Sequence, residues 1–593
     1  MSTGWTSLRY PAMSRVFTRR RSVVALAVVI GLLLVWVLVR QVWQVHEVTG
    51  VVMWSGQPVA EAVVRVKTTD FTARTDQDGA FTLSGFPGDF DVDVAAWAHG
   101  FYISGRTVRP WDGNVVIAIE SYTTEDNPDY EWVVPKIDDR STWLDLAIRA
   151  GLTTASWFSE TNAFRPLSER IDLACADCHG ETIYDQWVVS AHAAGTGNVR
   201  LMTMYNGTDL AGQRSQPTRF VTQRDYGRVP LPPDPLEPYF GPGFKLDFPE
   251  SAGSCASCHA PTAALDAPAG ADLNDVSGID AMGSHCDFCH KIVDTELDAR
   301  TGLPLENLPG VMSVDLRRPE EGTQVFFGPF DDVDVGPDTL SPAQAESRIC
   351  AACHDASFWG TKIYSSYSEW FASPYAAQGT TCQGCHMAPD GEMKNFAPGR
   401  GGQDRDPESI FTHSFPGASD TGLLQDTAQL EVTASRDGRS VRATVRVTNE
   451  KAGHHIPTGH PMRNIILIVR ATSNGERLEY VGGQFVPDWG GVGDDDDDYG
   501  GLPGNGYAKV LEERWTEVSP TAAYWNATTV LEDTRIPALG TDVTEYEFRL
   551  PDGGGPIEIS VELVFRRAFK GLAESKGWGD ADVVMEAVRV VVE

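Results

Sequence analysis

The residues with the clearest chemical potential are five copies of the pattern Cys-x-x-Cys-His, which together use all ten cysteines of this 593-residue chain. In this pattern two thioether bonds hold the vinyl groups of a haem, and the following histidine lies under the iron as its proximal ligand. The sequence therefore predicts five covalently bound c-type haems, and we number the motifs 1 to 5 in chain order. The haem-binding cysteines are Cys175, Cys178, Cys255, Cys258, Cys286, Cys289, Cys350, Cys353, Cys382 and Cys385, and the proximal ligands are His179, His259, His290, His354 and His386.

Other uses of paired cysteines fit this pattern less well. A structural zinc site groups four cysteine or histidine ligands around one metal, and a thioredoxin-like centre uses a single dithiol. Here every pair is followed at once by histidine, and no cysteine is left over. A disulfide within Cys-x-x-Cys closes too small a loop to stabilise the fold much. Haem attachment is therefore the interpretation we adopt.

A haem iron has a second axial position, which histidines outside the motifs could fill. Two of those histidines, His46 and His99, lie in segments predicted to be remote from the haem region. His285 is tethered too tightly to reach the haem of its own motif, so we expect it to serve a neighbour. One of the adjacent His454 and His455 is expected to bind. The candidate distal ligands are His192, His285, His413, His454 and His455, with His460 as the spare histidine.

The spacing of the motifs indicates an internal repeat, because their first cysteines lie 80, 31, 64 and 32 residues apart. The two short spacings pair motif 2 with motif 3, and motif 4 with motif 5, after a leading motif 1. The pairs align imperfectly, since His285 before motif 3 corresponds to Thr381 before motif 5. We therefore expect the second pair to take its ligands from His413 and the C-terminal region. Any open iron is expected in that pair.

The haem region, residues 126–426, is predicted to be mainly α-helical or irregular. Residues 141–150 have a helical pattern, and the segment YDQWVVSAHA is expected to carry His192 on a helix. Stretches rich in proline and glycine, such as 230–243 and 304–337, indicate loops that wrap the haem edges. Five haems in roughly 200 residues must pack closely, which suits electron transfer from one to the next.

Residues 46–125 and 427–593 predict two β-sandwiches that flank the haem region. Short runs rich in valine and isoleucine, separated by turn residues, predict the strands of the first one. Alternating apolar and polar residues at 441–447 and 557–565 predict half-buried strands in the second. The turn Asp76–Asp78 and the run Asp494–Asp498 are candidate Ca²⁺ sites, although a solvated turn or loop is the simpler explanation of both.

Residues 1–45 predict a cytoplasmic stub and a transmembrane helix. The apolar run 23–39 has 17 residues, about the minimum length of a membrane-spanning helix. A cluster of arginines before this run places the N-terminus in the cytoplasm. We therefore predict a single-pass protein of the cytoplasmic membrane, with the bulk of the chain on the periplasmic or extracellular side. A cleaved signal peptide is the alternative, and it too would place the haem region outside.

The composition limits the kinds of partner. The chain is 42% hydrophobic and 22% charged, as in globular proteins, and its formal net charge is −34. So acidic a chain argues against nucleic-acid binding, which needs basic patches. The expected partners are the membrane and redox proteins. The negative charge of the chain would favour redox proteins with basic surfaces. The charge also serves solubility.

Three stretches resemble known families. The pattern TGVV…GQPVAEAVVRV…TDQDGAFTLSGFP resembles the carboxypeptidase regulatory-like domain, which implies a transthyretin-like sandwich that acts as a spacer or interaction module. CADCH…YDQWVVSAHA is similar to a segment of the tetrahaem cytochrome that accepts electrons from hydroxylamine oxidoreductase. CAACH…CQGCHM, HSFPG and NEKAGHHIPTG resemble a broad group of multihaem c-type cytochromes. This resemblance implies electron transfer and a distal role for His192. Five motifs argue against the activity of the octahaem hydroxylamine oxidoreductase itself.

Three functions follow from these observations. The first is a membrane-anchored electron carrier whose closely packed haems all have two histidine ligands, which leaves no site for substrate on iron. The second is an oxidoreductase that acts on a small nitrogen or sulfur compound at one open haem. The third is an electron-transfer subunit of a larger membrane complex or filament, with the two sandwiches as docking surfaces.

Overall fold

The computed structural model describes residues 44–137, 174–333, 336–398, 402–550 and 555–593, together with Leu26 and Val29–Gly31. The predicted helix at 141–150 lies outside these residues. The chain divides into two compact units, which we describe separately. Unit 1 comprises Met1–Tyr122 and Asp331–Gly336, and unit 2 comprises Thr123–Phe330 and Pro337–Glu593.

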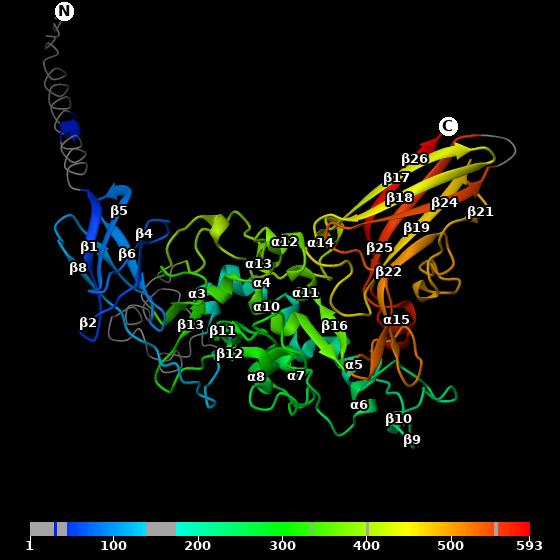
Figure 1. The fold of residues 1–593 in the computed structure, drawn as a ribbon, viewed down its shortest axis with the longest axis horizontal. Helices are drawn as coiled ribbons and strands as arrows, with labels where there is room; N and C mark the ends of the chain where they lie inside the picture. The colour runs from blue at the N-terminus through cyan, green and yellow to red at the C-terminus, as the bar shows by residue number, and fades with distance from the viewer. Residues whose placement is uncertain are drawn as a thin grey trace, which may run out of the picture. The chain divides into compact units, whose positions relative to one another are not determined.

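Unit 1 consists of two four-stranded sheets that enclose one apolar core (Figure 1). Successive side chains of a strand point to opposite faces, so alternate residues such as Val115 and Ile117 are buried. Asp331 belongs to this unit although it lies far from the strands in sequence. Its Oδ1 forms an ion pair with Nε of Arg65 at 2.6 Å. One sheet contains β1 (Val45–Trp54), β2 (Gln57–Pro58), β5 (Ala80–Asp89) and β8 (Val115–Ala118), and the other contains β3 (Val63–Val66), β4 (Thr72–Arg74), β6 (Val92–Trp97) and β7 (Ser104–Val108).

The C-terminal part of unit 2 consists of two further sheets around the largest apolar core of the described residues. In β18, three valines and Ala443 alternate with polar residues, and these apolar residues are buried together with Asn449 at the end of the strand. Strand β19 pairs on both sides, with β22 and β25, and is almost continuously apolar and buried. One sheet contains β17 (Ala428–Asp437), β18 (Ser440–Asn449), β21 (Tyr480–Gly482) and β24 (Thr541–Arg549). The other contains β19 (Asn464–Ser473), β20 (Glu476–Arg477), β22 (Gly504–Glu513), β23 (Thr528–Asp533), β25 (Ile557–Arg566) and β26 (Val583–Val592).

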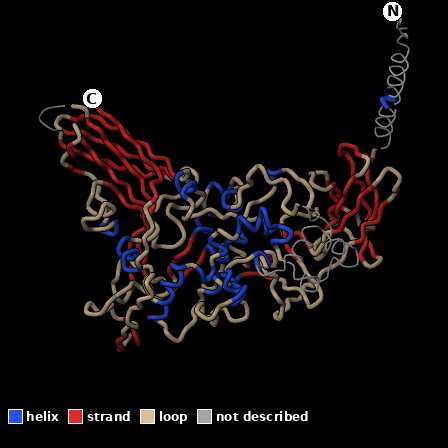
Figure 2. Tube along the Cα trace, turned by 180° about the vertical axis from the view of Figure 1, so that it is seen from behind, coloured by secondary structure: helices blue, strands red, loops and turns tan. Residues whose placement is uncertain are grey.

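The haem region of unit 2 is built from short helices, two-stranded sheets and long connections, as Figure 2 shows by colour. The helices are α3 (Ala176–His179), α4 (Asp185–Trp187), α5 (Val199–Asn206), α6 (Phe244–Asp247), α7 (Ala256–His259), α8 (Pro261–Ala264), α9 (Cys286–Cys289), α10 (Arg348–His354), α11 (Ser366–Phe371), α12 (Pro374–Ala377), α13 (Cys382–His386) and α14 (Thr421–Gln425); α15 (Lys570–Lys576) follows β25. The two-stranded sheets pair β9 (Phe220–Gln223) with β10 (Gly227–Pro230), β11 (Ile292–Thr295) with β12 (Val314–Leu316), β13 (Phe326–Gly328) with β14 (Asp338–Leu340), and β15 (Asp355–Phe358) with β16 (Thr361–Ser365).

Two buried lysines join the haem region to the C-terminal sheets within unit 2. Nζ of Lys576, at the end of α15, donates to the carbonyl oxygens of Thr203, Thr208 and Pro242 at 2.7–3.1 Å. Nζ of Lys509, on β22, donates to the carbonyl oxygens of residues 362 and 363 at 3.2–3.3 Å. Backbone carbonyl oxygens thus give each buried ammonium group acceptors for its protons.

The prediction of a transmembrane anchor is wrong for the part of the chain that the structure describes. No helix there is long and apolar enough to cross a membrane. A span needs about 20 residues, whereas the longest helix that we describe, α5, has 8. Of the predicted run 23–39, only Leu26 and Val29–Gly31 belong to the described residues. The predicted membrane partner and the single-pass localisation in the cytoplasmic membrane depended on this helix and are wrong with it.

The prediction that the haem region is mainly α-helical or irregular also needs correction. Four two-stranded sheets lie between the haem motifs in the described residues. A Cys-x-x-Cys-His motif needs only about one helical turn, so the motifs do not require long helices. The intervening chain is free to form hairpins such as β15–β16, which directly follows motif 4.

The two aspartate-rich turns are occupied by protein contacts. Oδ1 of Asp76 accepts hydrogen bonds from the backbone N–H groups of Asp78 and Ala80, both at 2.9 Å. In unit 2, Asp497 pairs with Lys570. Among the described residues, no three or more carboxylate, histidine or cysteine side chains gather where they could hold a metal ion. Calcium binding stays a prediction.

Candidate haem centres

Each of the five motifs forms a short helical turn in unit 2. The turns are the helices α3, α7, α9, α10 and α13, of which Figure 1 labels all but α9. Residues three and four positions apart lie on the same face of a helix. The second cysteine and the histidine of a motif therefore lie on the same side as the first cysteine, as one haem requires. None of the ten cysteines forms a disulfide.

Three motif histidines are oriented by hydrogen bonds from Nδ1 to backbone carbonyl oxygens. The acceptors are Phe396 for His179 at 2.7 Å, Phe327 for His290 at 2.8 Å and Pro416 for His386 at 2.7 Å. A carbonyl oxygen can only accept, so Nδ1 carries the proton and Nε2 keeps its lone pair. This tautomer is the one that binds metal through Nε2.

Three candidate distal histidines face motif histidines. The ring centroids of His290 and His413 are 6.4 Å apart, those of His386 and His454 are 6.3 Å apart, and those of His354 and His192 are 6.1 Å apart. A metal–imidazole nitrogen bond is about 2.0–2.1 Å long, so two imidazoles on opposite sides of one iron have centroids about 6–6.5 Å apart. The residues present therefore fit haem iron between each pair.

His192 reaches motif 4 because its segment packs against the chain just before motif 3. Its backbone carbonyl accepts from the N–H of Ser284 at 3.0 Å, and Nε1 of Trp187 donates to the carbonyl of Ser284 at 3.0 Å. Gly283 lies so close that a Cβ atom there would come within 2.3 Å of the carbonyl oxygen of His192. With a φ of +71°, this position also favours glycine by conformation.

The loop that carries His413 serves two motifs. Its Thr412 donates from the backbone N–H to the carbonyl of Met387 at 3.0 Å, directly after motif 5. Pro416, three residues after His413, accepts from His386 of the same motif. His413 itself faces His290 of motif 3. One loop therefore fixes the proximal side of motif 5 and the facing imidazole of motif 3.

Two other candidates use Nδ1 in a way that opposes iron binding. The backbone N–H of Phe288 donates to Nδ1 of His285 at 3.3 Å, and that of Met462 donates to Nδ1 of His460, also at 3.3 Å. In the neutral imidazole the proton is then on Nε2, which is not free for a metal. His285 acts instead as the N-cap of α9. Thr381 does the same for α13, where its hydroxyl accepts from the N–H of Gly384.

His455 lies beside a carboxylate and not opposite a motif histidine, with its Nδ1 3.7 Å from Oε1 of Glu369. Among the described residues, we find no imidazole that faces His179 or His259 at the distance of the three pairs. The assignment of His285 and His455 as distal ligands stays a prediction that these contacts do not favour. Motifs 1 and 2 are the two without a facing imidazole.

Thiols of different motifs lie side by side and give the motifs an order in space. Cys286 and burial raise the pKa of Cys175, so motif 1 lies beside motif 3. Likewise Cys353 of motif 4 and burial raise the pKa of Cys258 of motif 2. Cys382 of motif 5 and burial raise the pKa of Cys350 of motif 4, and Cys353 adds to the raised pKa of Cys289 of motif 3. Motif 4 therefore lies beside motifs 2 and 5 and within electrostatic range of motif 3. Motifs 4 and 5 are neighbours, as the spacing predicts, whereas motif 2 lies beside motif 4.

A cluster of polar rings lies beside motif 2. Tyr364, Tyr524 and His460 are in mutual contact, with ring centroids 5.3–6.0 Å apart. Burial raises the pKa of Tyr524, and the neighbouring thiols of Cys255 and Cys258 add to this shift. Sequence reasoning missed both tyrosines, because they are more than 100 residues from motif 2 and carry no local signal.

Arg463 completes the cluster beside motif 2. Its Nη1 donates to the carbonyl of Thr458 at 3.0 Å, and no carboxylate of the described residues pairs with it. Burial lowers the pKa of Arg463, while Tyr364 opposes the shift. Arg463 is half-buried, and a guanidinium without an acidic partner can donate hydrogen bonds to an anion.

Comparison with known proteins adds a limited structural likeness. No known protein family matches the chain, and no curated protein does. The chain is similar to a penta-haem cytochrome c552 from Thermochromatium tepidum, with 21% sequence identity and a TM-score of 0.47 over 70% of this chain and 97% of that one. It is also similar to a PapD-like domain of human CEP192, with 10% identity and a TM-score of 0.11 over 28% of this chain and 83% of that one.

Proposed function

We propose that the chain is a pentahaem c-type cytochrome that transfers electrons through closely spaced haems. The observation that carries the proposal is the set of three facing imidazole pairs, each made of one motif histidine and one histidine from elsewhere in the chain. Bound haem would supply a one-electron redox centre, and two histidine ligands leave no axial site for substrate. The chain's own contribution is to fix the ring orientations and to place the motifs next to one another.

Haem content and axial ligation test this proposal directly. We expect a pyridine haemochrome assay to give five haems per chain, from the five motifs. Replacing His192, His413 or His454 with alanine should open one iron each. The ferrous protein should then bind one more carbon monoxide per chain than the wild type.

The matched control for these variants is His455→Ala, which removes the neighbour of His454. It should leave carbon monoxide binding unchanged, because His455 faces Glu369 and not a motif histidine. Haem content far below five, or an unchanged carbon monoxide stoichiometry in all three ligand variants, would contradict the proposal.

A second candidate function is an oxidoreductase that acts on a small nitrogen or sulfur compound at the haem of motif 2. The cluster of Tyr364, Tyr524, His460 and Arg463 favours it. These side chains can donate hydrogen bonds to a small anion, and Arg463 lacks an acidic partner among the described residues. This proposal moves the open iron from the second motif pair, where spacing suggested it, to motif 2.

Nitrite is a suitable probe of this second function. We expect the oxidised protein to have a high-spin ferric signal in electron paramagnetic resonance (EPR) that shifts on titration with nitrite. Arg463→Gln should weaken the apparent nitrite affinity about tenfold or more, since a hydrogen bond to a charged group contributes about 1.5–3 kcal/mol. The control is Arg567→Gln, which removes a neighbouring arginine that already pairs with Asp580. A wild type without a nitrite-sensitive high-spin signal would refute the enzymatic role.

A further inference from the structure

The loop between β18 and β19 carries His454 and is held by three separate anchors. Nδ2 of the buried Asn449 donates to the carbonyl of His454 at 2.7 Å. The backbones of Ile456 and Ile536 exchange hydrogen bonds of 2.9 and 3.1 Å. The third anchor is the carboxylate of Glu369, which comes from the haem region. A loop held at three points can present an imidazole in one fixed orientation.

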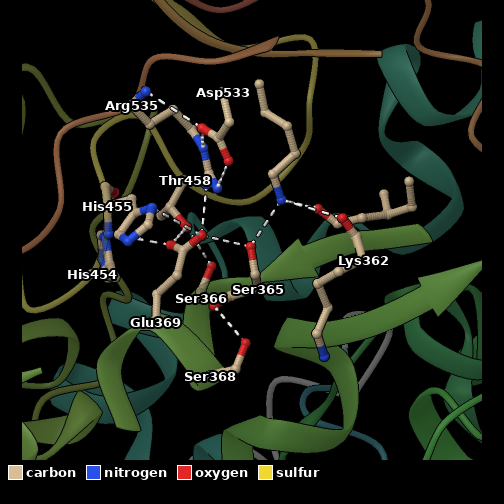
Figure 3. Close-up of polar contacts among 12 residues, drawn as sticks. Lys362, Ser365, Ser366, Ser368, Glu369, His454, His455, Thr458, Asp533 and Arg535 are labelled. Atoms are coloured by element: carbon tan, nitrogen blue, oxygen red, sulfur yellow. Dashed lines mark hydrogen bonds and ion pairs between the residues drawn. The ribbon is translucent and has the colours of Figure 1, made fainter. Parts of the chain in front are cut away.

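One carboxylate oxygen of Glu369 contacts the loop, and the other contacts Ser365 and Arg535 outside the loop (Figure 3). Oε2 accepts from the backbone N–H of His455 at 3.2 Å and from the hydroxyl of Thr458 at 2.8 Å. Oε1 accepts from Oγ of Ser365 and Nη1 of Arg535, each at 2.6 Å. The side chain is only 6% exposed. All four hydrogen bonds therefore form away from bulk water, where an unpaired group costs most.

The environment of Glu369 keeps its carboxyl group ionised. Burial by itself would raise its pKa, but Arg535 and the hydrogen bonds from Ser365 and Thr458 outweigh burial and lower the pKa. Arg535 is itself held by both oxygens of Asp533, each at 2.8 Å. The carboxylate therefore has a fixed charge and a fixed position.

Glu369 belongs to the chain segment that leads into motif 5. It lies on α11, and the adjacent Trp370 donates from Nε1 to the carbonyl of Thr380 at 2.8 Å, two residues before Cys382. Gly453 packs against Trp370 and Tyr375 on the other side, where a Cβ atom would come within 3.3 Å of both. The segment before motif 5 and the loop opposite it are thus joined directly, with Glu369 as the charged contact.

We propose that Glu369 is a positioning residue that selects His454, and not the adjacent His455, as the imidazole facing His386. It holds the backbone of His455 through Oε2, while Oε1 lies 3.7 Å from Nδ1 of the same residue. The ring of His454 is then directed to motif 5, with its Nδ1 3.0 Å from the carbonyl of His455. This inference rests on the proposed haem ligation at motif 5 and adds the residue that decides between two neighbouring histidines.

The test compares Glu369→Gln with a matched variant, Asp582→Asn. Asp582, just before β26, forms a similar ion pair with Arg566 at the end of β25, whose side chain is 6% exposed, and both are remote from the motifs in sequence. Both variants are purified with haem, and their ferric EPR spectra and ferrous carbon monoxide stoichiometry are measured. His454→Ala gives the reference for complete loss of the ligand.

We expect Glu369→Gln to lose part or all of the low-spin signal that disappears in His454→Ala, up to one haem in five, and to bind additional carbon monoxide. Asp582→Asn should match the wild type. If Glu369→Gln keeps five haems with unchanged spectra, the inference is overturned. Equal spectral changes in Asp582→Asn would overturn it too, because they would show that losing any buried ion pair destabilises the protein enough to disturb haem ligation. Unchanged spectra in His454→Ala would instead refute the ligation itself. Should Glu369→Gln fail to accumulate, Thr458→Val removes one contact of the same carboxylate and should produce a smaller change of the same kind; no change there would overturn the inference.

Discussion

Replacing Asp287 with alanine should lower the free energy of unfolding by about 3–5 kcal/mol, because it leaves a buried charge without its partner. Asp287 and Lys291 form an ion pair one helical turn apart, and both side chains are fully buried. Oδ2 of Asp287 also accepts from the hydroxyl of Tyr130 at 2.9 Å and from the backbone N–H of Val133 at 2.8 Å. The substitution therefore leaves three donors without the carboxylate that accepts their hydrogen bonds.

The surroundings of Lys291 make Asp287 its main electrostatic partner. Nζ of Lys291 lies 4.1 Å from the ring centroid of Phe326 and 5.1 Å from that of Tyr130, so the ammonium group is enclosed by aromatic rings. Burial lowers the pKa of Lys291, and Asp287 is the first group that opposes this. Without Asp287, the lysine must either remain charged in an apolar site or lose its proton, and both cost free energy.

Guanidinium denaturation of the haem-loaded protein, followed by circular dichroism, measures this loss. The control is Glu479→Ala, which breaks the exposed pair with Arg549 and should cost about 0–1 kcal/mol. The double variant Asp287→Asn, Lys291→Met removes both charges and should recover most of the stability. A loss below about 1 kcal/mol for Asp287→Ala would contradict the prediction, because it would mean that water or another group replaces the carboxylate.

The sequence predicts the groups of the haem centres better than it predicts their pairing. The Cys-x-x-Cys-His pattern is local, and each motif adopts the single helical turn that the pattern requires. The facing partner of a motif histidine is not local: His192 lies 162 residues before His354 in the chain and meets it only through tertiary packing. Spacing along the chain carries no information about such contacts.

The ambiguity among the remaining histidines has the same physical origin. His285 is buried and His454 is half-buried, both next to haem-region segments, and composition cannot separate them. The difference is one hydrogen bond at Nδ1, accepted from an N–H in His285 and donated to a carbonyl in His454. The alignment of His285 with Thr381 in the sequence has a simple explanation, since both cap the helix of the following motif.

Replacing His192 with methionine should slow electron exchange among the haems more than the same change at any other distal position. Under the proposed function, His192 ligates the haem of motif 4, which lies beside motifs 2 and 5 and within electrostatic range of motif 3. Methionine–histidine ligation raises the reduction potential of a haem relative to two histidines. The first electron to enter should then be held at the central haem, through which electrons must pass between motifs 1 and 3 on one side and motifs 2 and 5 on the other.

Two variants with the same chemical change serve as matched controls. His413→Met alters motif 3, which lies between motifs 1 and 4, so it should delay exchange with the haem of motif 1 alone. His454→Met alters motif 5, whose thiol contact joins it to motif 4, so it should affect no other transfer. Film voltammetry at increasing scan rates measures how many haems exchange electrons within a given time. The expected order of loss at fast scan rates is His192→Met, then His413→Met, then His454→Met. Equal losses in all three would mean that the haems communicate by routes other than motif 4, and the branching order inferred from the thiol contacts would be wrong.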